Sequence, residues 1–469
     1  MTEAAPKITV YITNHNYERY VGMAIESVLA QTTADWELIV IDDGSSDGSR
    51  AIIEGYRANP KVRLVFQEQK GLNVTNNIAY RLARGAYLMR LDADDYIAPE
   101  ALAALSGVLD REPKVGLVFP DYYHVDEAGE IVELVRRHDF ETVGLLDQPA
   151  HGACTMIRKA CLDVIGGYDE AFTCQDGVDI WLRFIEHFEV RNVNLPLFYY
   201  RRHGGNLTRD ESRLLETRAQ IFAKRAEARA RDRSVIGVIP VRGRSVDPRS
   251  VEMELLGGKP LLEWTIDAAL AAASLSKVVV TSPDAAVLAH VRQRYPDGTV
   301  TVLARDPALA GLNTRIEETV RDAVGRTADP ARPFDYVVTL MIESPFRLGS
   351  EIDMAVDVLT VFDLDSAVSV RPELDVFYQH HGDGLVPVRR TPQLRLEREE
   401  LYREAGQIYA TRCAALQGGG RLVDGRIGHF VVHEASAVRL TSAWMWQVAR
   451  SIAPSVANGA GLRQATARD

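Results

Sequence analysis

The 469-residue chain has few cysteines and no long apolar run. Its four cysteines (Cys154, Cys161, Cys174 and Cys413) lack the spacing of a zinc ribbon or a disulfide framework, so we expect free thiols in a reducing compartment. No stretch reaches the roughly 18 apolar residues that a membrane-spanning helix needs. The first residues lack the basic and apolar regions of a secretory signal. These absences predict a cytoplasmic protein and leave open a peripheral position at the inner membrane.

The chain also lacks a surplus of basic residues. Its 54 Lys and Arg residues are outnumbered by 65 Asp and Glu residues, which gives a formal net charge of -11. A dedicated nucleic-acid-binding protein would carry a basic surface, so we do not expect nucleic acid as a partner. A length of 469 residues exceeds the size at which one hydrophobic core keeps growing, and it therefore predicts two domains.

The order of elements in the first half predicts a doubly wound α/β sheet. Apolar strands are expected at 8–12, 36–41, 62–66 and 86–91, and helical patterns at 20–31, 49–56 and 74–83. Strand-helix-strand units of this kind have right-handed crossovers and parallel strands. Ligands of such sheets bind beyond the carboxyl ends of the strands. Asp42 and Asp43 follow one of these strands and Asp92 to Asp95 follow another, so both groups are expected at one crevice.

A second α/β half follows a charged segment, 209–233, that contains neither Gly nor Pro. This segment predicts a helix that closes the first domain and joins it to the next. A strand at 235–240 then restarts the alternation, with a helix at 261–272, a strand at 277–281, a helix at 285–294 and a strand at 336–341. We therefore expect two tandem Rossmann-like domains with mostly parallel sheets, at 1–208 and 234–452, and a flexible tail at 453–469.

The sequence Asp92-Ala93-Asp94-Asp95 is an unusual ending for a hydrophobic strand. Packing does not explain three carboxylates there, whereas a divalent cation held against a diphosphate needs hard oxygen ligands on a rigid element. Asp94 is the preferred cation ligand, and Asp92 is expected nearer the ribose of a nucleotide. The alternative is a polar strand end in which Asp95 or an earlier acid caps the next helix.

Asp176 is the candidate general base. Apolar residues recur at helical spacing after it, so it is expected at the N-terminus of a helix, where the dipole and free amides hold a carboxylate in place. Displacement at an anomeric carbon requires such a base to accept the proton of the acceptor hydroxyl. The alternative is that Asp176 only serves as an N-cap. Asp179, one turn later, is expected to orient or pair rather than react.

These residues resemble the inverting family 2 glycosyltransferases of the GT-A fold, over roughly residues 7–225. The resemblance is carried by the segments 12–17, 27–32, 40–47, 92–95, 166–170 and 175–176. It implies that Thr13 and Asp43 contact the nucleobase, Asp92 the ribose and Asp94 a bound Mn²⁺ or Mg²⁺. Asp42 and Asp95 are weaker candidates of the same acidic motifs.

The resemblance extends to the acceptor side and to a late motif. Asp176 would act on the acceptor hydroxyl, and the segment 152–156 lies where the family places its acceptor loop. His203, at the end of Tyr199-Tyr200-Arg201-Arg202-His203, would reach the metal or the diphosphate. Gln175 replaces the usual Glu before the base, which removes a negative charge and should slightly lower the proton affinity of Asp176. The resemblance implies a nucleoside-diphosphate-sugar donor and a carbohydrate, lipid-linked or protein glycan acceptor in bacterial polysaccharide or glycoconjugate biosynthesis.

The second half resembles the acylneuraminate cytidylyltransferases, which make CMP-sugars. The similar segments are 239–245, 256–266, 343–347 and 404–409, and they contain the candidate phosphate-binding residues Arg242 and Lys259. The family's loop cations and its late Asp-Ile-Asp motif are replaced here, the latter by Arg439-Leu440-Thr441. We therefore expect a degenerate domain that binds a nucleotide sugar or forms a homodimer. A bifunctional enzyme that makes a CMP-sugar and a non-enzymatic scaffold are the alternatives.

Overall fold

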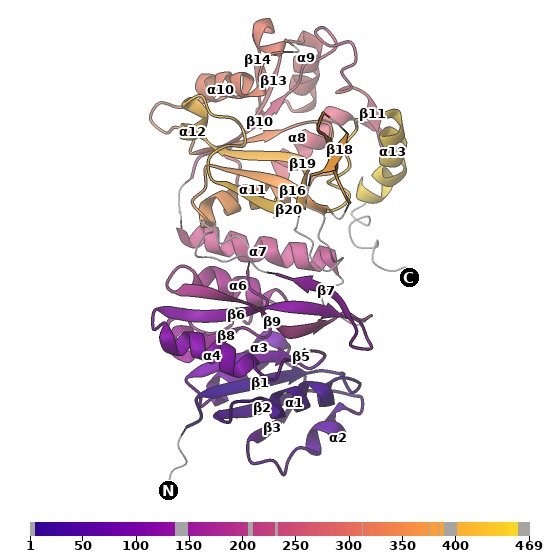
Figure 1. Ribbon diagram of the computed structural model, residues 1–469. Helices are drawn as coiled ribbons and strands as arrows, with labels where there is room; N and C mark the ends of the chain where they lie inside the picture. The colour runs from indigo at the N-terminus through magenta and orange to yellow at the C-terminus, as the bar shows by residue number, and fades with distance from the viewer. Residues whose placement is uncertain are drawn as a thin grey trace. The chain divides into compact units, whose positions relative to one another are not determined.

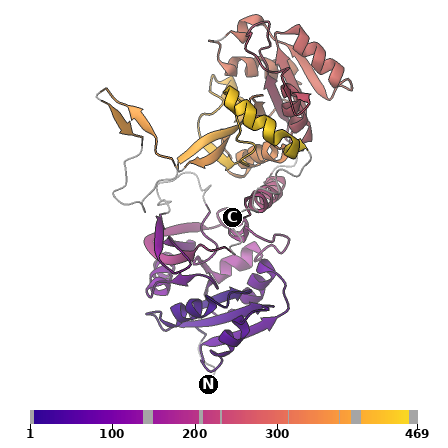
Figure 2. The same ribbon diagram turned by 90° about the vertical axis from the view of Figure 1, so that its right-hand side faces the viewer.

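The computed structural model describes residues 5–136, 149–204, 210–229, 233–311, 313–373, 375–382, 384–388 and 401–457. These residues form two compact units. The first contains the described residues within 1–209 and 376–399, and the second those within 210–375 and 400–469. Figures 1 and 2 show the helices and strands of each unit.

The first unit is built on a nine-stranded sheet with the order β3-β2-β1-β4-β8-β6-β9-β5, in which β7 pairs with β6. Its strands are β1 (Ile8–Asn14), β2 (Trp36–Asp43), β3 (Val62–Gln67), β4 (Tyr87–Asp92), β5 (Tyr96–Ile97), β6 (Val115–Val125), β7 (Ile131–Val135), β8 (Met156–Arg158) and β9 (Glu189–Arg201). Its helices are α1 (Val21–Leu29), α2 (Ser49–Glu54), α3 (Leu72–Leu82), α4 (Ala101–Arg111), α5 (Lys159–Ile165) and α6 (Asp176–Phe184). The predicted α/β fold with mostly parallel sheets is confirmed.

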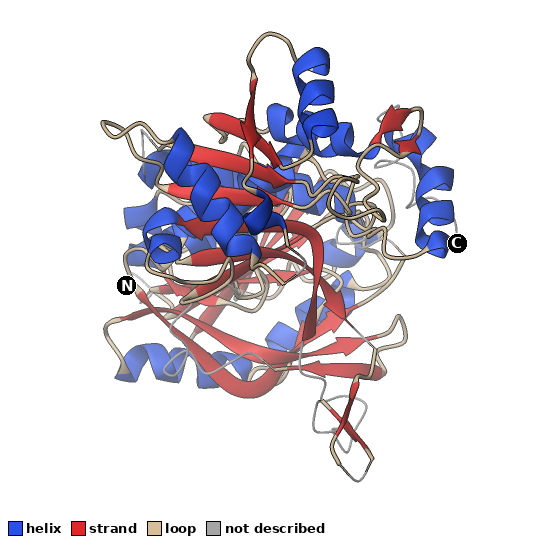
Figure 3. Ribbon diagram, turned by 90° about the horizontal axis from the view of Figure 1, so that it is seen from above, coloured by secondary structure: helices blue, strands red, loops and turns tan. Residues whose placement is uncertain are grey.

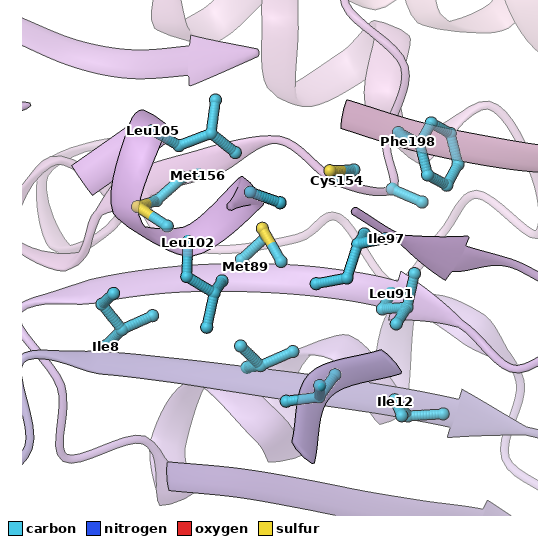
Figure 4. Packing of buried hydrophobic residues seen from close by; sticks show 14 of the residues in the cluster. Ile8, Ile12, Met89, Leu91, Ile97, Leu102, Leu105, Cys154, Met156 and Phe198 are labelled. Carbon is cyan, nitrogen blue, oxygen red and sulfur yellow. The ribbon is translucent and has the colours of Figure 1, made fainter. Parts of the chain in front are cut away.

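The central strands are apolar because both of their faces are covered. Every residue of β2 is buried, as expected for a parallel strand between two layers of helices. On one face Ile8, Ile12, Met89 and Leu91 pack against residues that include Leu102 of α4 (Figure 4). This packing holds the carboxyl ends of β1, β2 and β4 side by side.

The second unit repeats the strand arrangement of the first. Figure 3 colours the helices blue and the strands red. Its main sheet has the order β14-β13-β10-β15-β19-β16-β20 and consists of β10 (Val235–Pro240), β13 (Lys277–Ser282), β14 (Val300–Ala304), β15 (Tyr336–Leu340), β16 (Ser366–Glu373), β19 (Leu401–Arg412) and β20 (Ile427–Val431). Four parallel strands are followed by the antiparallel strand β19, as β8 follows in the first sheet. In each sheet the next two strands are parallel to each other. The assignment of this unit to the same transferase fold class stays a prediction.

The remaining elements of the second unit are helices and one short hairpin. The helices are α7 (Glu211–Arg229), α8 (Leu261–Ala271), α9 (Ala285–Arg294), α10 (Ile316–Thr327), α11 (Gly349–Val361), α12 (Cys413–Gln417) and α13 (Ala443–Ala457). A short hairpin joins β11 (Leu255–Leu256) and β12 (Lys259–Pro260). The hairpin of β17 (Tyr378–His380) and β18 (Leu385–Pro387) is grouped with the first unit. In the described residues, no helix has both the length and the apolar character needed to cross a bilayer.

The helix predicted to close the first domain belongs to the second unit instead. The ring of Phe222 on α7 lies 5.9 Å from that of Phe362, just after α11. Arg229 donates to the carbonyl of Val361, and Glu211 pairs with Arg371 of β16 at 2.5 Å. The apolar positions of the segment correctly indicated a buried helical face, but they do not specify which core covers that face. The ends of the predicted linker at 209 and 230–232 lie outside the described residues.

The predicted flexible tail also begins too early. Helix α13 continues to Ala457, and Ala453 is fully buried, so the helix extends past residue 452. Small residues such as Ala favour a helix and allow close packing, whereas we expected them to mark a flexible tail. Residues 458–469 lie outside the described residues.

Candidate functional site

The carboxyl ends of β1, β2 and β4 carry the predicted acids in adjacent registers. Thr13 on β1 lies beside Ile41 of β2 and Asp92 of β4, and Asn14 lies beside Asp42. The fold therefore places Thr13 next to the acid expected at the ribose. Thr13 is half-buried.

Asp43 organises the loop that follows β3. Its carboxylate accepts hydrogen bonds from Gln67 Nε2 at 2.7 Å and from the backbone N–H groups of Lys70 at 2.8 Å and Gly71 at 2.9 Å. Two carboxylate oxygens offer about four acceptor positions, so these three bonds leave room for one more. The structure thus shows Asp43 holding the loop after β3 in place, and its expected contact with a nucleobase stays a prediction.

Asp42 serves the local structure at the end of β2. It accepts from Asn14 Nδ2 at 2.8 Å and from Ser45 Oγ at 2.5 Å, and it is buried. These bonds join the turn after β2 to β1. The partners of the weaker candidate Asp42 are therefore structural ones.

Asp94 and His203 are brought together from segments 109 residues apart. Nε2 of His203 lies 3.0 Å from Oδ2 of Asp94, and both side chains are buried. The imidazole ring packs against Tyr17 and Tyr20, with ring centroids 5.7 and 5.1 Å away. The two predicted metal ligands therefore point at one place.

A carboxylate and an imidazole supply two of the six ligands that Mg²⁺ or Mn²⁺ takes. No set of three or more His, Cys, Asp and Glu side chains is arranged for a metal ion within the described ranges. Magnesium in nucleotide sites is commonly held by one or two carboxylates together with substrate phosphates and water. The donor set of Asp94 and His203 fits a cation that shares its remaining positions with a diphosphate.

Asp95 is buried inside the first unit. Its Oδ1 accepts from the backbone N–H of Arg201 at 2.8 Å, and Nε of Arg201 donates to the carbonyl of Asp94 at 3.0 Å. Burial raises the pKa of Asp95 well above its usual range, and the charges of Asp94 and Asp92 raise it further. The alternative that Asp95 caps the next helix is wrong, because the N-cap of α4 is Glu100.

Asp176 is the first residue of α6, as predicted. The N-cap position is held by Gln175, in a left-handed conformation with φ of 58°, so Asp176 is not the N-cap. Its carboxylate is buried and accepts from Nη1 of Arg90. Asp179 pairs with Arg183 at 2.5 Å, which agrees with the prediction that it orients or pairs.

Arg90 is the site residue that sequence reasoning missed. It lies near the end of β4, its side chain is only 5% exposed, and its Nε lies 2.9 Å from Oδ1 of Asp92. Burial raises the pKa of Asp92 to about 6, with Asp94 and Asp176 adding to the rise and Arg90 opposing it. A cation inside an otherwise apolar central strand was the available signal, because a buried charge requires a partner.

The two candidates of the second unit have local partners there. Nζ of Lys259 lies 2.7 Å from Asp267 and 4.2 Å from the ring centroid of Trp264. Arg242 is 4.0 Å from Asp247 and partly exposed. Both residues belong to the second unit.

The first unit is therefore an α/β domain with acids at the carboxyl ends of parallel strands, the class that binds nucleotides beyond its strand ends. Residues 9–165 match glycosyl transferase family 2. The N-terminal part of the chain is thus a family 2 glycosyltransferase domain.

Similar proteins are mostly named as glycosyltransferases or polysaccharide synthases. Chondroitin synthase of Escherichia coli is 26% identical over 205 residues, 43% of this chain and 30% of that protein. The putative glycosyltransferase EpsE of Bacillus subtilis (strain 168) is 28% identical over 207 residues, 42% of this chain and 73% of that protein. The structure of Staphylococcus aureus TarS 1–349 in complex with UDP-GlcNAc covers 47% of this chain and 66% of its own, with 18% identity and a TM-score of 0.38. The chain spans about a third of the length of the chondroitin synthase.

Proposed function

We propose that the first unit is an inverting, metal-dependent glycosyltransferase of the hexosyltransferase type. The observation that carries this proposal is the convergence of the Asp94–His203 pair and the linked carboxylates of Asp92 and Asp176 in one unit. The match to glycosyl transferase family 2 supports the reaction class.

Asp176 is the general base of the proposed reaction. Its carboxylate accepts the proton of the acceptor hydroxyl, whose oxygen attacks the anomeric carbon on the face opposite the departing diphosphate. A single displacement of this kind inverts the anomeric configuration. Asp94 and His203 would hold Mn²⁺ or Mg²⁺, which when bound supplies positive charge for the diphosphate. The burial of these side chains limits the access of water that would compete with the acceptor.

The proposed substrates are a nucleoside-diphosphate sugar and a hydroxyl group on a carbohydrate, a lipid-linked glycan or a protein glycan. Thr13 and Asp43 would contact the nucleobase and Asp92 the ribose, in keeping with their places at the ends of β1, β2 and β4. The polysaccharide synthases among the similar proteins support a role in polysaccharide or glycoconjugate biosynthesis. The four cysteines, all free and buried, fit a cytoplasmic location, and peripheral attachment to the inner membrane stays open.

A panel of UDP-, GDP-, dTDP- and CMP-sugars, assayed for nucleotide release with Mn²⁺ or Mg²⁺, tests this function. The wild-type protein should release nucleotide from one of the nucleoside-diphosphate sugars, and this release should require the metal. Asp176→Asn should lower the rate by about 10²-fold or more, because it removes the base but keeps the size of the side chain. Asp94→Ala should abolish the metal dependence together with activity. Full activity of Asp176→Asn on the true acceptor would refute the assigned base.

We propose that the second unit binds a nucleotide sugar or forms a homodimer, without cytidylyltransferase activity. By the resemblance to cytidylyltransferases, Arg439 and Thr441 would take the places of metal-binding acids, and a cation cannot replace a carboxylate as a magnesium ligand. The bifunctional alternative requires CTP- and magnesium-dependent release of pyrophosphate with a nonulosonic acid. Including these reagents in the same panel should give no pyrophosphate above background. The scaffold alternative would require the first unit to be inactive as well.

A further inference from the structure

A buried guanidinium lies between the two functional carboxylates of the first unit. Arg90 is on β4, a central strand, where a charge is tolerated only with compensating partners. Its Nη1 donates to Oδ2 of Asp176 on α6. Its Nε and Nη2 lie 2.9 and 3.4 Å from the two carboxylate oxygens of Asp92. One rigid group therefore contacts the acid expected at the donor and the acid expected at the acceptor.

The surrounding backbone leaves little room for this group to move. A Cβ atom added to Gly152 would lie 2.7 Å from Nη2 of Arg90 and 3.3 Å from Oδ2 of Asp176. A Cβ atom on Gly177 would lie 3.2 Å from the backbone of Gly152. The glycines let the loop before β8 and the start of α6 close over the ion pair. This close fit restricts both the orientation of the guanidinium plane and the position of its charge.

We propose that Arg90 is a positioning residue that fixes the base Asp176 relative to the donor carboxylate Asp92. This inference rests on the proposed glycosyltransferase function. The guanidinium is planar and presents its N–H donors in fixed directions, so the orientation of one carboxylate constrains the other. Asp94 adds negative charge near Asp92, but its own carboxylate is directed to His203. Lys could replace the charge of Arg90 but not this two-sided geometry.

The first experiment compares Arg90→Lys, Arg90→Ala and the control Arg158→Lys with wild type. Arg158 lies on neighbouring β8 and donates to the carbonyls of Leu109 and Val115, so its replacement perturbs the same sheet away from the acids. Arg90→Lys should fold, and its kcat should fall by about 10²-fold because a base displaced by an ångström loses its alignment. Its KM for the donor should change less than tenfold. Arg158→Lys should keep kcat within threefold.

Two further readouts separate positioning from mere support of the fold. Added guanidinium chloride at millimolar concentration should restore part of the kcat of Arg90→Ala, and it should not rescue Asp176→Asn. Without metal or nucleotide, the changes in unfolding temperature caused by Asp92→Asn and Asp176→Asn should not add in the wild-type background. In the Arg90→Lys background they should add more closely.

The outcomes distinguish this inference from the function on which it rests. If wild type transfers sugar and Asp176→Asn does not, but Arg90→Lys keeps the wild-type kcat, the positioning role is wrong. Additive effects of the two Asn substitutions in the wild-type background would also overturn it. If wild type transfers sugar from no donor of the panel, the proposed function itself fails, while the thermal measurements still decide whether Arg90 couples the two acids.

Discussion

At the scale of single residues, the contact between Asp94 and His203 is the most direct test of a metal site. The two side chains are buried and 3.0 Å apart. Loss of the imidazole should therefore lower the affinity of the site for the cation, and not only its affinity for the nucleotide-sugar donor. We expect His203→Gln to raise the Mn²⁺ concentration for half-maximal activity by about tenfold or more. Metal titrations of the initial rate measure this shift.

The matched control is His187→Gln, since His187 is exposed and packs on Phe188. It should leave the metal titration unchanged. An unchanged titration for His203→Gln would exclude His203 as a ligand and leave Asp94 as the protein's contribution. Removal of the metal with EDTA should abolish activity of wild type and of His187→Gln alike.

The sequence predicted individual residues of the site better than it predicted their partners. Asp94, His203 and Asp176 were identified by residue type and motif, and the structure places the first two in contact. The pairing of Asp176 with Arg90 was not predicted, because it joins a strand to a helix 86 residues later through tertiary packing. Asp42 was a weaker candidate than Asp43, and only the hydrogen bonds of the folded turn show that its partners are structural.

At the scale of elements, strand and helix positions followed from hydrophobic periodicity, but the partners of α7 did not. Its buried residues Ile221 and Phe222 could have faced either core, and the structure places them on the second. Glu227 of α7 and Asp353 of α11 add negative charge around Asp357, while Arg233 opposes them. The packing of α7 against α11 therefore surrounds one acid with like charges.

This arrangement predicts a pH-dependent stability of the second unit. Burial, more than the charge of Asp353, raises the pKa of Asp357 from 3.8 to about 7. A raised pKa means that the folded state favours the protonated acid, so its stabilisation is complete below pH 3.8 and is lost as the pH rises through about 7. The loss amounts to at most a few kcal/mol, since one pKa unit corresponds to about 1.4 kcal/mol. Asp357→Asn should remove this slope and should be more stable than wild type at pH 8.

Urea unfolding at pH 5 and pH 8 measures this difference in stability between the two pH values. Hydrogen exchange of peptides from α11 monitors the unfolding of the second unit. The control is Asp363→Asn, just after α11, where the carboxylate is 81% exposed and its ion pair with Arg412 contributes little. Its stability should follow wild type at both pH values. A slope for Asp357→Asn equal to that of wild type would show that Asp357 is ionised in the folded state.

At the scale of the whole molecule, the repeated strand order was predictable because both halves alternate strands and helices in the same way. The antiparallel strands in the mixed parts of the sheets were not predicted. Strands such as β8 and β19 pair in antiparallel fashion with the central strands, and antiparallel partners distant in sequence leave no periodic signal. The second half is expected to lack metal-binding acids, so the proposed dimerisation is tested in place of catalysis.

The hairpin of β17 and β18, which is grouped with the first unit, carries exposed apolar residues that can be tested directly. Tyr378, Leu385 and Val386 are 59%, 68% and 42% exposed, and a two-stranded hairpin with exposed apolar residues is only marginally stable alone. We therefore predict that this hairpin takes part in the homodimer, in addition to the second unit.

We expect the full chain to form dimers at micromolar concentration through this hairpin, because a second copy would remove the apolar side chains from water. The double substitution Tyr378→Ser and Leu385→Ser should give a monomer with unchanged circular dichroism. Val164→Ser, which alters an exposed apolar residue on α5, should stay dimeric. Sedimentation velocity over a hundredfold range of concentration measures the masses. A wild type that remains monomeric over that range, or a hairpin variant that sediments as wild type does, would assign these exposed residues to something other than dimerisation.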